Sequence, residues 1–324
     1  MKLFFKKSLK IMLCLASISL SNGVLYSVPQ TTLPFYIALK QQNVQNIFTR
    51  LEQVSDPDNA NYGNYMTHDE IRELVSPDLQ DVIPIMQFTT NANCTWFGDM
   101  IKCEHNPGNL SQFPLVEFVE HAPLLGKKFN KLPTHPQDKS NYIGREVLLS
   151  LYNIPDSIAK NSSVCAVEYQ NNSGYSSSDL YQHQILNNEN NNTVKHTIGT
   201  DTGSDLETQL DIQMMSQTFE DVQLWFWGSP AWLYTFAINF MNTDNVPSVL
   251  SMSWGWSETD QCSITNCVTS KQYVDRVNVE YAKLGLRGIT IVVASGDAGA
   301  PGRTDEMCDS GSVHAVFPGG SPYV

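Results

Sequence analysis

The chain has 324 residues, of which 41% are hydrophobic and 16% are charged, and its formal net charge is −13. This length allows two domains with cores of their own, and the acidity argues against nucleic acid or an anionic membrane as the main partner. The excess of acidic residues is explained equally well by solubility and by service in an acidic compartment, where carboxylates lose their charge.

Residues 1–23 have the pattern of a secretory signal peptide. Lysines at positions 2, 6, 7 and 10 precede an apolar run over 11–20, and small residues follow, so we expect cleavage after Gly23. The apolar run is too short for a transmembrane helix, and no other stretch of the sequence is long and apolar enough to be one.

Six cysteines lie outside the predicted signal peptide, and an even number in a secretory chain permits disulfides. Six cysteines allow fifteen complete pairings, but the closely spaced pairs Cys94–Cys103 and Cys262–Cys267 are the expected bridges. Neither pair has the spacing of a zinc site. Five glycosylation sequons fit the same secretory route: Asn93, Asn109, Asn161, Asn171 and Asn191.

Residues 24–130 are expected to form a small α+β domain. Thr67 and Glu70 are spaced as the capping box that begins a helix. The predicted elements, in chain order, are a strand over 33–40, helices over 42–55, 67–77 and 78–88, and a hairpin closed by the first cysteine pair.

Residues 131–145 are polar and contain prolines, which is typical of an exposed connector and a natural cleavage site. From 146 to 324 strands alternate with helices, which predicts βαβ units around a parallel sheet with helices on both faces. Strands are expected over 163–169, 221–227, 246–254 and 288–294, and helices over 178–188, 204–219, 231–242 and 271–284.

Two of these strands end in motifs that can carry chemistry. The sequence SWG at 253–255 follows one strand and SGD at 295–297 follows the other. Open α/β sheets place their active groups beyond the carboxyl ends of their strands, so both motifs are candidates for a site. A plain turn, in which Asp297 bonds its own backbone, is the simpler explanation of the second motif.

The helix over 204–219 carries Glu207 and Asp211 one turn apart, on the same face. Two carboxylates held this close share protons, so the pKa of one rises and the pair can act as a general base in acid. A capping box of Ser204 with Glu207, together with the helix dipole, would explain these acids without catalysis. The sequence has no HExxH, Walker, dinucleotide-glycine or GxSxG motif.

Taken in order, the ExxxD helix, SMSWG at 251–255, VVASGDAG at 292–299 and FPGGSPYV at 317–324 resemble the sedolisins, which are serine-carboxyl peptidases. The N-terminal stretch, with its SDP break and its YGxYxT motif at 62–67, resembles the prodomain of the same family. The resemblance implies a subtilisin-like α/β fold over 146–324, incomplete in this chain, preceded by a small α+β prodomain over 24–130.

The resemblance also implies roles for the motif residues. By the family pattern Glu207 would be the base towards a nucleophilic serine, Asp211 would orient Glu207, and Asp297 would be the acid of the oxyanion hole. A protonated Asp can donate a hydrogen bond to a developing oxyanion, whereas a histidine base would be charged in acid. Ser253, Trp254 and Gly255 would line the cleft for an extended peptide.

The sequence departs from the family pattern in one respect that bears on activity. The family's nucleophile lies in a Gly-Thr-Ser motif downstream of SGD, and its calcium loop lies further on, but neither occurs here. We therefore expect an acid serine peptidase by class, either a tripeptidyl-peptidase or an endopeptidase, present as an inactive fragment without its nucleophile. No cofactor is expected within the chain, and calcium is expected for the full-length domain beyond Val324.

The alternative is a non-catalytic secreted binding protein, or a pseudoenzyme, that retains the prodomain and part of the catalytic fold. On either hypothesis we expect a peptide or unfolded protein as the ligand and a prodomain that packs on its own catalytic domain. We expect no nucleic acid partner and no membrane span. The signal peptide, the sequons and the acid chemistry predict the secretory pathway, leading to the lysosome, another acidic compartment or the cell exterior.

Overall fold

The computed structural model of the chain describes residues 33–121, 143–155, 161–169, 173–199, 205–218, 221–265, 267–303 and 311–324. The predicted signal peptide at 1–23, most of the predicted connector at 131–145, and the residues Asn171 and Ser204 lie outside them. Within the described ranges, no helix combines the length and the apolar character needed to cross a bilayer.

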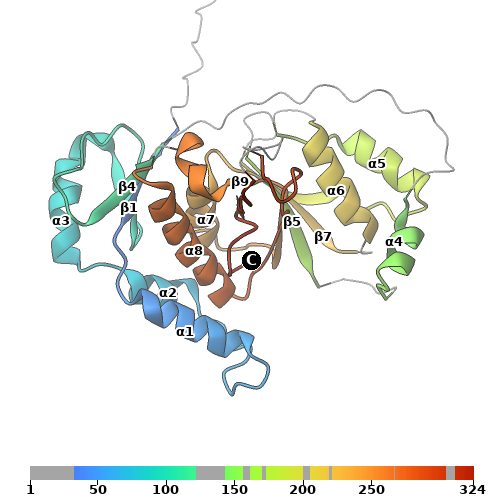
Figure 1. Cartoon of the computed structure of the whole chain (residues 1–324), viewed down its shortest axis with the longest axis horizontal. Helices are drawn as coiled ribbons and strands as arrows, with labels where there is room; N and C mark the ends of the chain where they lie inside the picture. Colours follow the sequence, from blue (N-terminus) through green and yellow to red (C-terminus); the bar gives the residue numbers. More distant parts are fainter. Residues whose placement is uncertain are drawn as a thin grey trace, which may run out of the picture. The chain divides into compact units, whose positions relative to one another are not determined.

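The N-terminal part is a four-stranded sheet with three α-helices (Figure 1), in the strand order β2-β3-β1-β4 and with antiparallel pairs throughout. The capping box of Thr67 and Glu70 is confirmed. The elements are β1 Phe35–Leu39, α1 Val44–Ser55, α2 His68–Val75, α3 Leu79–Phe88, the 3-10 turn η1 Thr90–Ala92, β2 Cys94–Trp96, β3 Met100–Cys103 and β4 Val116–Glu120.

The second part contains a five-stranded parallel sheet in the order β10-β8-β5-β7-β6. Its elements are α4 Arg145–Leu151, β5 Ser163–Glu168, α5 Ser177–Leu186, β6 Val194–Gly199, α6 Leu206–Thr218, β7 Gln223–Gly228, α7 Leu233–Met241, β8 Val249–Met252, β9 Trp256–Ser257, the 3-10 turn η3 Glu258–Ser263, α8 Ser270–Leu286, β10 Thr290–Val293 and β11 Val316–Phe317. The predicted fold class, a parallel sheet covered by helices and preceded by a small α+β unit, is confirmed.

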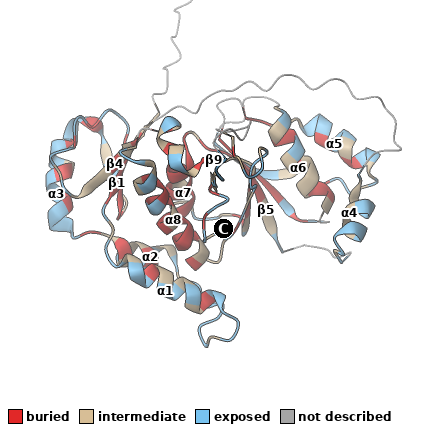
Figure 2. Ribbon diagram, viewed as in Figure 1, coloured by how far each residue is buried: buried red, intermediate tan, exposed pale blue. Residues whose placement is uncertain are grey.

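Side-chain alternation along β5 explains why helices cover both faces. Cys165 and Val167 pack into the large core formed with α7 and α8, whereas Ala166 packs on the other face against Leu180 of α5 and Ile212 of α6. A central strand with apolar residues on both sides has to be covered twice. Figure 2 shows α7 and α8 buried along most of their length, while α5 and α6 keep an exposed outer side.

The strand order places a topological switch point at the carboxyl end of β5. The chain leaves β5 for the edge strand β6, returns through β7, and then crosses to β8 on the opposite side of β5. At such a switch point the connections depart in opposite directions, which leaves the space beyond the strand ends open to side chains from several loops.

Strand β6 was not predicted. Its sequence, VKHTIG at 194–199, mixes polar and apolar residues, and the strand pairs only with β7 at the edge of the sheet. Helix α4 was not predicted either, and it begins at the last residue of the predicted connector. The contacts join residues 32–324 into one compact unit, so the domain boundaries at 130 and 145 stay predictions.

Both predicted disulfides are present. Cys94 and Cys103 lie opposite each other on β2 and β3, and Cys262 is bonded to Cys267 in the loop before α8. Cys165 is buried in β5 as a free thiol. Four of the predicted glycosylation sites, Asn93, Asn109, Asn161 and Asn191, are exposed, and glycosylation stays a prediction.

A buried cluster of charges joins the N-terminal sheet to α8. Asp99, next to β3, accepts hydrogen bonds from Lys283 Nζ at 2.7 Å and Arg276 Nη2 at 3.1 Å, and Glu280 pairs with the same two cations. Burial by itself would raise the pKa of Asp99, but the charges of Lys283 and Arg276 lower it to about 2. Asp99 is therefore held ionised inside the protein.

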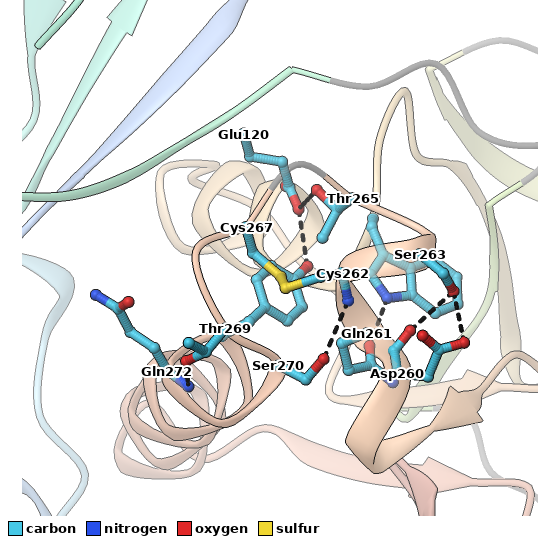
Figure 3. The surroundings of a disulfide bond; sticks show 12 residues. Glu120, Asp260, Gln261, Cys262, Ser263, Thr265, Cys267, Thr269, Ser270 and Gln272 are labelled. Atoms are coloured by element: carbon cyan, nitrogen blue, oxygen red, sulfur yellow. Dashed lines mark hydrogen bonds between the residues drawn. A yellow bond between two sulfur atoms is a disulfide. The ribbon is translucent and has the colours of Figure 1, made fainter. Parts of the chain in front are cut away.

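A second junction surrounds Glu120, the last residue of β4. Its buried carboxylate accepts hydrogen bonds from Thr265 Oγ1 at 3.0 Å, from the Tyr273 hydroxyl at 2.8 Å and from the backbone N–H and the hydroxyl of Thr235. Figure 3 shows Glu120 pointing at Thr265. Burial raises the pKa of Glu120, and the donated hydrogen bonds partly offset that rise.

We predict that Asp99→Asn destabilises the protein by about 3 kcal/mol at pH 6, because it leaves Lys283 and Arg276 short of a buried counter-ion. The pKa of Asp99 is lowered from 3.8 to about 2, so its contribution is present above that range and is lost as the pH falls through it. The difference in unfolding free energy between the variant and the wild type should therefore become about 2 kcal/mol smaller between pH 5 and pH 2.

Urea unfolding followed by tryptophan fluorescence at several pH values measures this gap. Asp69→Asn is the control, because Asp69 is exposed and pairs with Arg72 on the surface of α2. It should change the stability by less than about 1 kcal/mol at every pH. A gap for Asp99→Asn that does not change with pH would contradict the role of its ionised form.

We predict that removing the Cys262–Cys267 disulfide by a double Ser substitution costs about 2 kcal/mol, since a short loop regains freedom in the unfolded chain. The loop carries Thr265, one of the donors to Glu120. The Thr235 N–H, which donates to Glu120 at 2.8 Å, should then exchange its hydrogen faster with solvent.

Hydrogen exchange measured by NMR or mass spectrometry reads this contact directly. The matched control removes the Cys94–Cys103 disulfide, which closes a loop in the N-terminal sheet instead. The control should lower the global stability and leave the relative protection of Thr235 unchanged. Equal protection of Thr235 in both double variants would show that the Cys262–Cys267 loop does not support the Glu120 junction.

Candidate active site

Helix α6 begins with an aspartate cap, Asp205. Asp205 Oδ1 accepts the N–H of Thr208 at 3.1 Å, and Asp205 Oδ2 accepts the Thr208 hydroxyl at 2.6 Å and the N–H of Gly174 at 3.0 Å. This is an N-cap with its partner at the third helical position. The alternative explanation of Glu207 as a capping partner of Ser204 is therefore not needed to start the helix.

Asp211 and Ser253 are brought together by α6 and the end of β8. The Ser253 hydroxyl lies 2.7 Å from Asp211 Oδ2 and 2.9 Å from Oδ1, so it donates to this carboxylate. Burial raises the pKa of Asp211, the hydrogen bond from Ser253 lowers it in part, and the charge of Asp205 raises it again.

Glu207 stands one turn earlier on α6 and is half-buried. Its pKa is raised first by burial and then by the charges of Asp211, Asp297 and Asp205, while a hydrogen bond with Ser253 lowers it in part. Asp297, exposed on the loop after β10, is thus near enough to the first turns of α6 for its charge to act on Glu207. All three acids of the predicted site, and Ser253, thus surround one region at the carboxyl edge of the sheet.

Trp254 and Gly255 are held beside the acids by different contacts. The indole N–H of Trp254 donates to Glu168 Oε2 at 2.6 Å. A Cβ on Gly255 would lie 2.7 Å from Val316 Cγ1 and 3.1 Å from the carbonyl oxygen of Phe317, so only glycine allows this approach of β9 to β11. Their predicted place in a substrate cleft stays a prediction.

Glu168 was missed by the sequence analysis. It is the last residue of the central strand β5 and is fully buried, and its Oε1 has no hydrogen-bond partner. Burial raises its pKa well above the usual range, the charge of Asp211 raises it further, and the Trp254 hydrogen bond opposes the rise. The signal was a carboxylate at the end of an apolar strand, the same signal that singled out Asp297.

These acids form a group that shares protons rather than a metal site. Carboxylates that raise one another's pKa values in a buried region cannot all be ionised together, so some remain protonated and can donate hydrogen bonds. A cavity of about 420 Å³ is lined by Asp211, by the C-terminal half of α6 and by residues at the amino ends of β5 and β8, so most of it lies away from the carboxyl edge where the acids gather. In the part of the chain that the structure describes, no three His, Cys, Asp or Glu side chains are arranged to hold a metal ion, and the calcium expected beyond Val324 stays a prediction.

The family model described as "Pro-kumamolisin, activation domain" matches residues 27–104, which lie inside the predicted prodomain. Physarolisin of Physarum polycephalum is 34% identical over 332 residues, which cover 89% of this chain and 58% of the relative. These matches support the sedolisin family for this chain. Its N-terminal part thus matches an activation domain, and Asp99, inside that match, is where this part packs against α8.

Tripeptidyl-peptidase 1 of Mus musculus is 25% identical over 364 residues, which cover 91% of this chain and 61% of the relative. This chain therefore spans about three fifths of the length of these two curated relatives. Among solved structures, the epidermin leader peptide processing serine protease of Staphylococcus aureus covers 90% of this chain and 69% of its own, with a TM-score of 0.43 at 10% identity.

We predict that Glu168→Gln makes the protein more stable at pH 8 than the wild type and removes part of the pH dependence of its stability. The pKa of Glu168 is raised in the folded state, so the stability linked to this group is present at low pH and is lost as the pH rises towards the raised value. Glutamine has the same shape and no charge to bury.

Urea unfolding at pH 5 and pH 8 tests this prediction. Glu73→Gln, the same substitution at an exposed position of α2, is the control. It should leave the difference in unfolding free energy between pH 5 and pH 8 as it is in the wild type. A wild type and a Glu168→Gln variant that respond alike to pH would mean that Glu168 is not the buried acid described here.

Proposed function

We propose that this sedolisin supplies the acid and base groups of a serine peptidase that is made as a secretory proenzyme and hydrolyses peptide bonds at acid pH. The observation that carries the proposal is the meeting of Glu207, Asp211, Ser253 and Asp297 at the carboxyl edge of the sheet. These residues come from three separate segments, α6, the end of β8 and the loop after β10, so their meeting is a property of the fold.

In this proposal Glu207 is the general base and Asp211 orients it. The raised pKa of Glu207 brings its proton exchange closer to neutrality than that of a free glutamate, so it can take a proton from a hydroxyl and return it to a leaving amine. A histidine base would already be protonated in an acidic compartment. Asp211 accepts the hydrogen bond from the Ser253 hydroxyl, and its charge raises the pKa of Glu207, which favours the protonated form of Glu207.

Asp297 is assigned to the oxyanion. Its side chain is exposed on the loop after β10, so it can reach a substrate carbonyl. An Asp stabilises a developing oxyanion by donating a hydrogen bond, which it does only in the protonated form that an acidic medium favours. The backbone of Ser253, Trp254 and Gly255 is assigned to an extended peptide substrate.

We assign no nucleophile among the 324 residues, because they contain no Gly-Thr-Ser motif. We therefore propose that these residues on their own are inactive and need the Gly-Thr-Ser segment of the family to complete an acyl-enzyme mechanism. The substrate is a peptide or unfolded protein, cut either as N-terminal tripeptides or internally. The secretory signal and the sequons support delivery to a lysosome or another acidic compartment.

A chimera tests the roles of the acids. It fuses this chain to the part of physarolisin that lies beyond the matched region, and its activity is assayed at acid pH on a tripeptidyl substrate and on an internally quenched peptide. Glu207→Gln, Asp211→Asn and Asp297→Asn should each lower kcat/KM by about 100-fold or more, since each removes a proton carrier or a transition-state contact.

Asp275→Asn is the matched control, because Asp275 is exposed on α8 and pairs only with Lys271 in the part described. It should leave kcat/KM unchanged. Full activity in any of the three site variants would remove that residue from the mechanism. Activity of the unfused chain would show that a nucleophile lies among these residues and would overturn the proposed inactivity.

A further inference from the structure

Asp205 occupies a position that its capping role alone does not explain. Its two oxygens accept three hydrogen bonds, from the N–H and the hydroxyl of Thr208 and from the N–H of Gly174. Gly174 lies between β5 and α5, so Asp205 ties the connection after the central strand to the first turn of α6.

The charge of this residue reaches every buried acid of the site. Asp205 contributes to the raised pKa values of Glu168 on β5 and of Glu207 and Asp211 on α6. The other groups that face the pair are Ser253 at the end of β8, which lowers both pKa values, and Asp297 after β10, which raises that of Glu207.

The start of a helix would otherwise have the opposite effect on Glu207. The unpaired N–H groups at a helix N-terminus favour negative charge and lower the pKa of a carboxyl in the first turn. A neutral cap, such as Ser or Asn, would satisfy the same N–H of Thr208 and would leave this lowering of the pKa in place. An ionised cap at this position counteracts the helix dipole as well as starting the helix.

We propose that Asp205 is a positioning residue of the acid site: its ionised carboxylate, fixed at the N-terminus of α6, keeps a proton on the Glu207–Asp211 pair and sets the pH at which the pair exchanges it. The buried Glu168, whose Oε1 has no partner, is the independent sign that this region holds protonated acids. The consequence for catalysis rests on the proposed function, but the proton equilibrium can be measured without it.

The test is Asp205→Asn in the 324-residue chain, because Asn caps a helix about as well as Asp and carries no charge. The chain is labelled with ¹³C at the Asp and Glu carboxyls and titrated by NMR. Loss of a signal in Glu207→Gln and in Asp211→Asn assigns the two resonances. In Asp205→Asn both titration midpoints should move to lower pH, by about half a unit or more.

Asp179→Asn is the matched control, since it makes the same change in net charge in the first turn of the neighbouring helix α5. Its midpoints should coincide with those of the wild type. Asp205→Ser, another neutral cap, replaces Asp205→Asn if that variant does not fold. Midpoints that stay in place in the neutral-cap variant, or that move equally in Asp179→Asn, would overturn the proposal.

The chimera with the physarolisin segment separates this proposal from the proposed function. If Asp205 tunes a working site, Asp205→Asn should shift the acid limb of the kcat/KM profile to lower pH by the amount seen in the titration. A shift in the titration with no activity in any chimera would contradict the peptidase assignment and leave Asp205 as a determinant of the proton equilibrium.

Discussion

The structure depends on the burial of carboxyl groups whose neighbours, in the part of the chain that the structure describes, are other carboxyl groups and neutral donors. At the carboxyl edge of the parallel sheet, Glu168, Glu207 and Asp211 are all partly or fully withdrawn from water, and their pKa values are raised by burial and by one another's charge. The Ser253 hydroxyl donates to Asp211 and the Trp254 indole N–H donates to Glu168, and both donors are neutral. Such a group is stable only if it holds protons, so an acidic medium is the one that suits it.

The junction between prodomain and catalytic domain follows the opposite principle. Asp99 is also buried, but Lys283 and Arg276 lie at hydrogen-bonding distance and lower its pKa to about 2. Acidification therefore has opposite effects at the two places, because it removes stability from an ion-paired acid and relieves repulsion among unpaired ones. The same residue type, an aspartate partly or fully withdrawn from water, has a lowered pKa beside two cations and a raised pKa among other acids, so the neighbours make the difference.

Much of the fold was predictable because its signals are local. The capping box of Thr67 and Glu70, the two closely spaced disulfides and the apolar strands of the parallel sheet each depend on residues near one another in the sequence, and each is present. The edge strand β6 was missed because its sequence mixes polar with apolar residues. Polar residues are tolerated there because β6 lies at the edge of the sheet, where its side chains stay exposed or half-buried. Glu168 was missed because an acid that ends a strand is informative only when that strand is known to be central.

The sequence by itself determined where each candidate side chain stands in its own element: two acids one turn apart on α6, and a serine and an aspartate just beyond two strands. Only the tertiary structure decided that these positions meet. The order β10-β8-β5-β7-β6 turns positions far apart in the chain into neighbours, because parallel strands align their carboxyl ends at one edge. Burial at that edge, which no single segment encodes, then raises the pKa values of Glu168, Glu207 and Asp211.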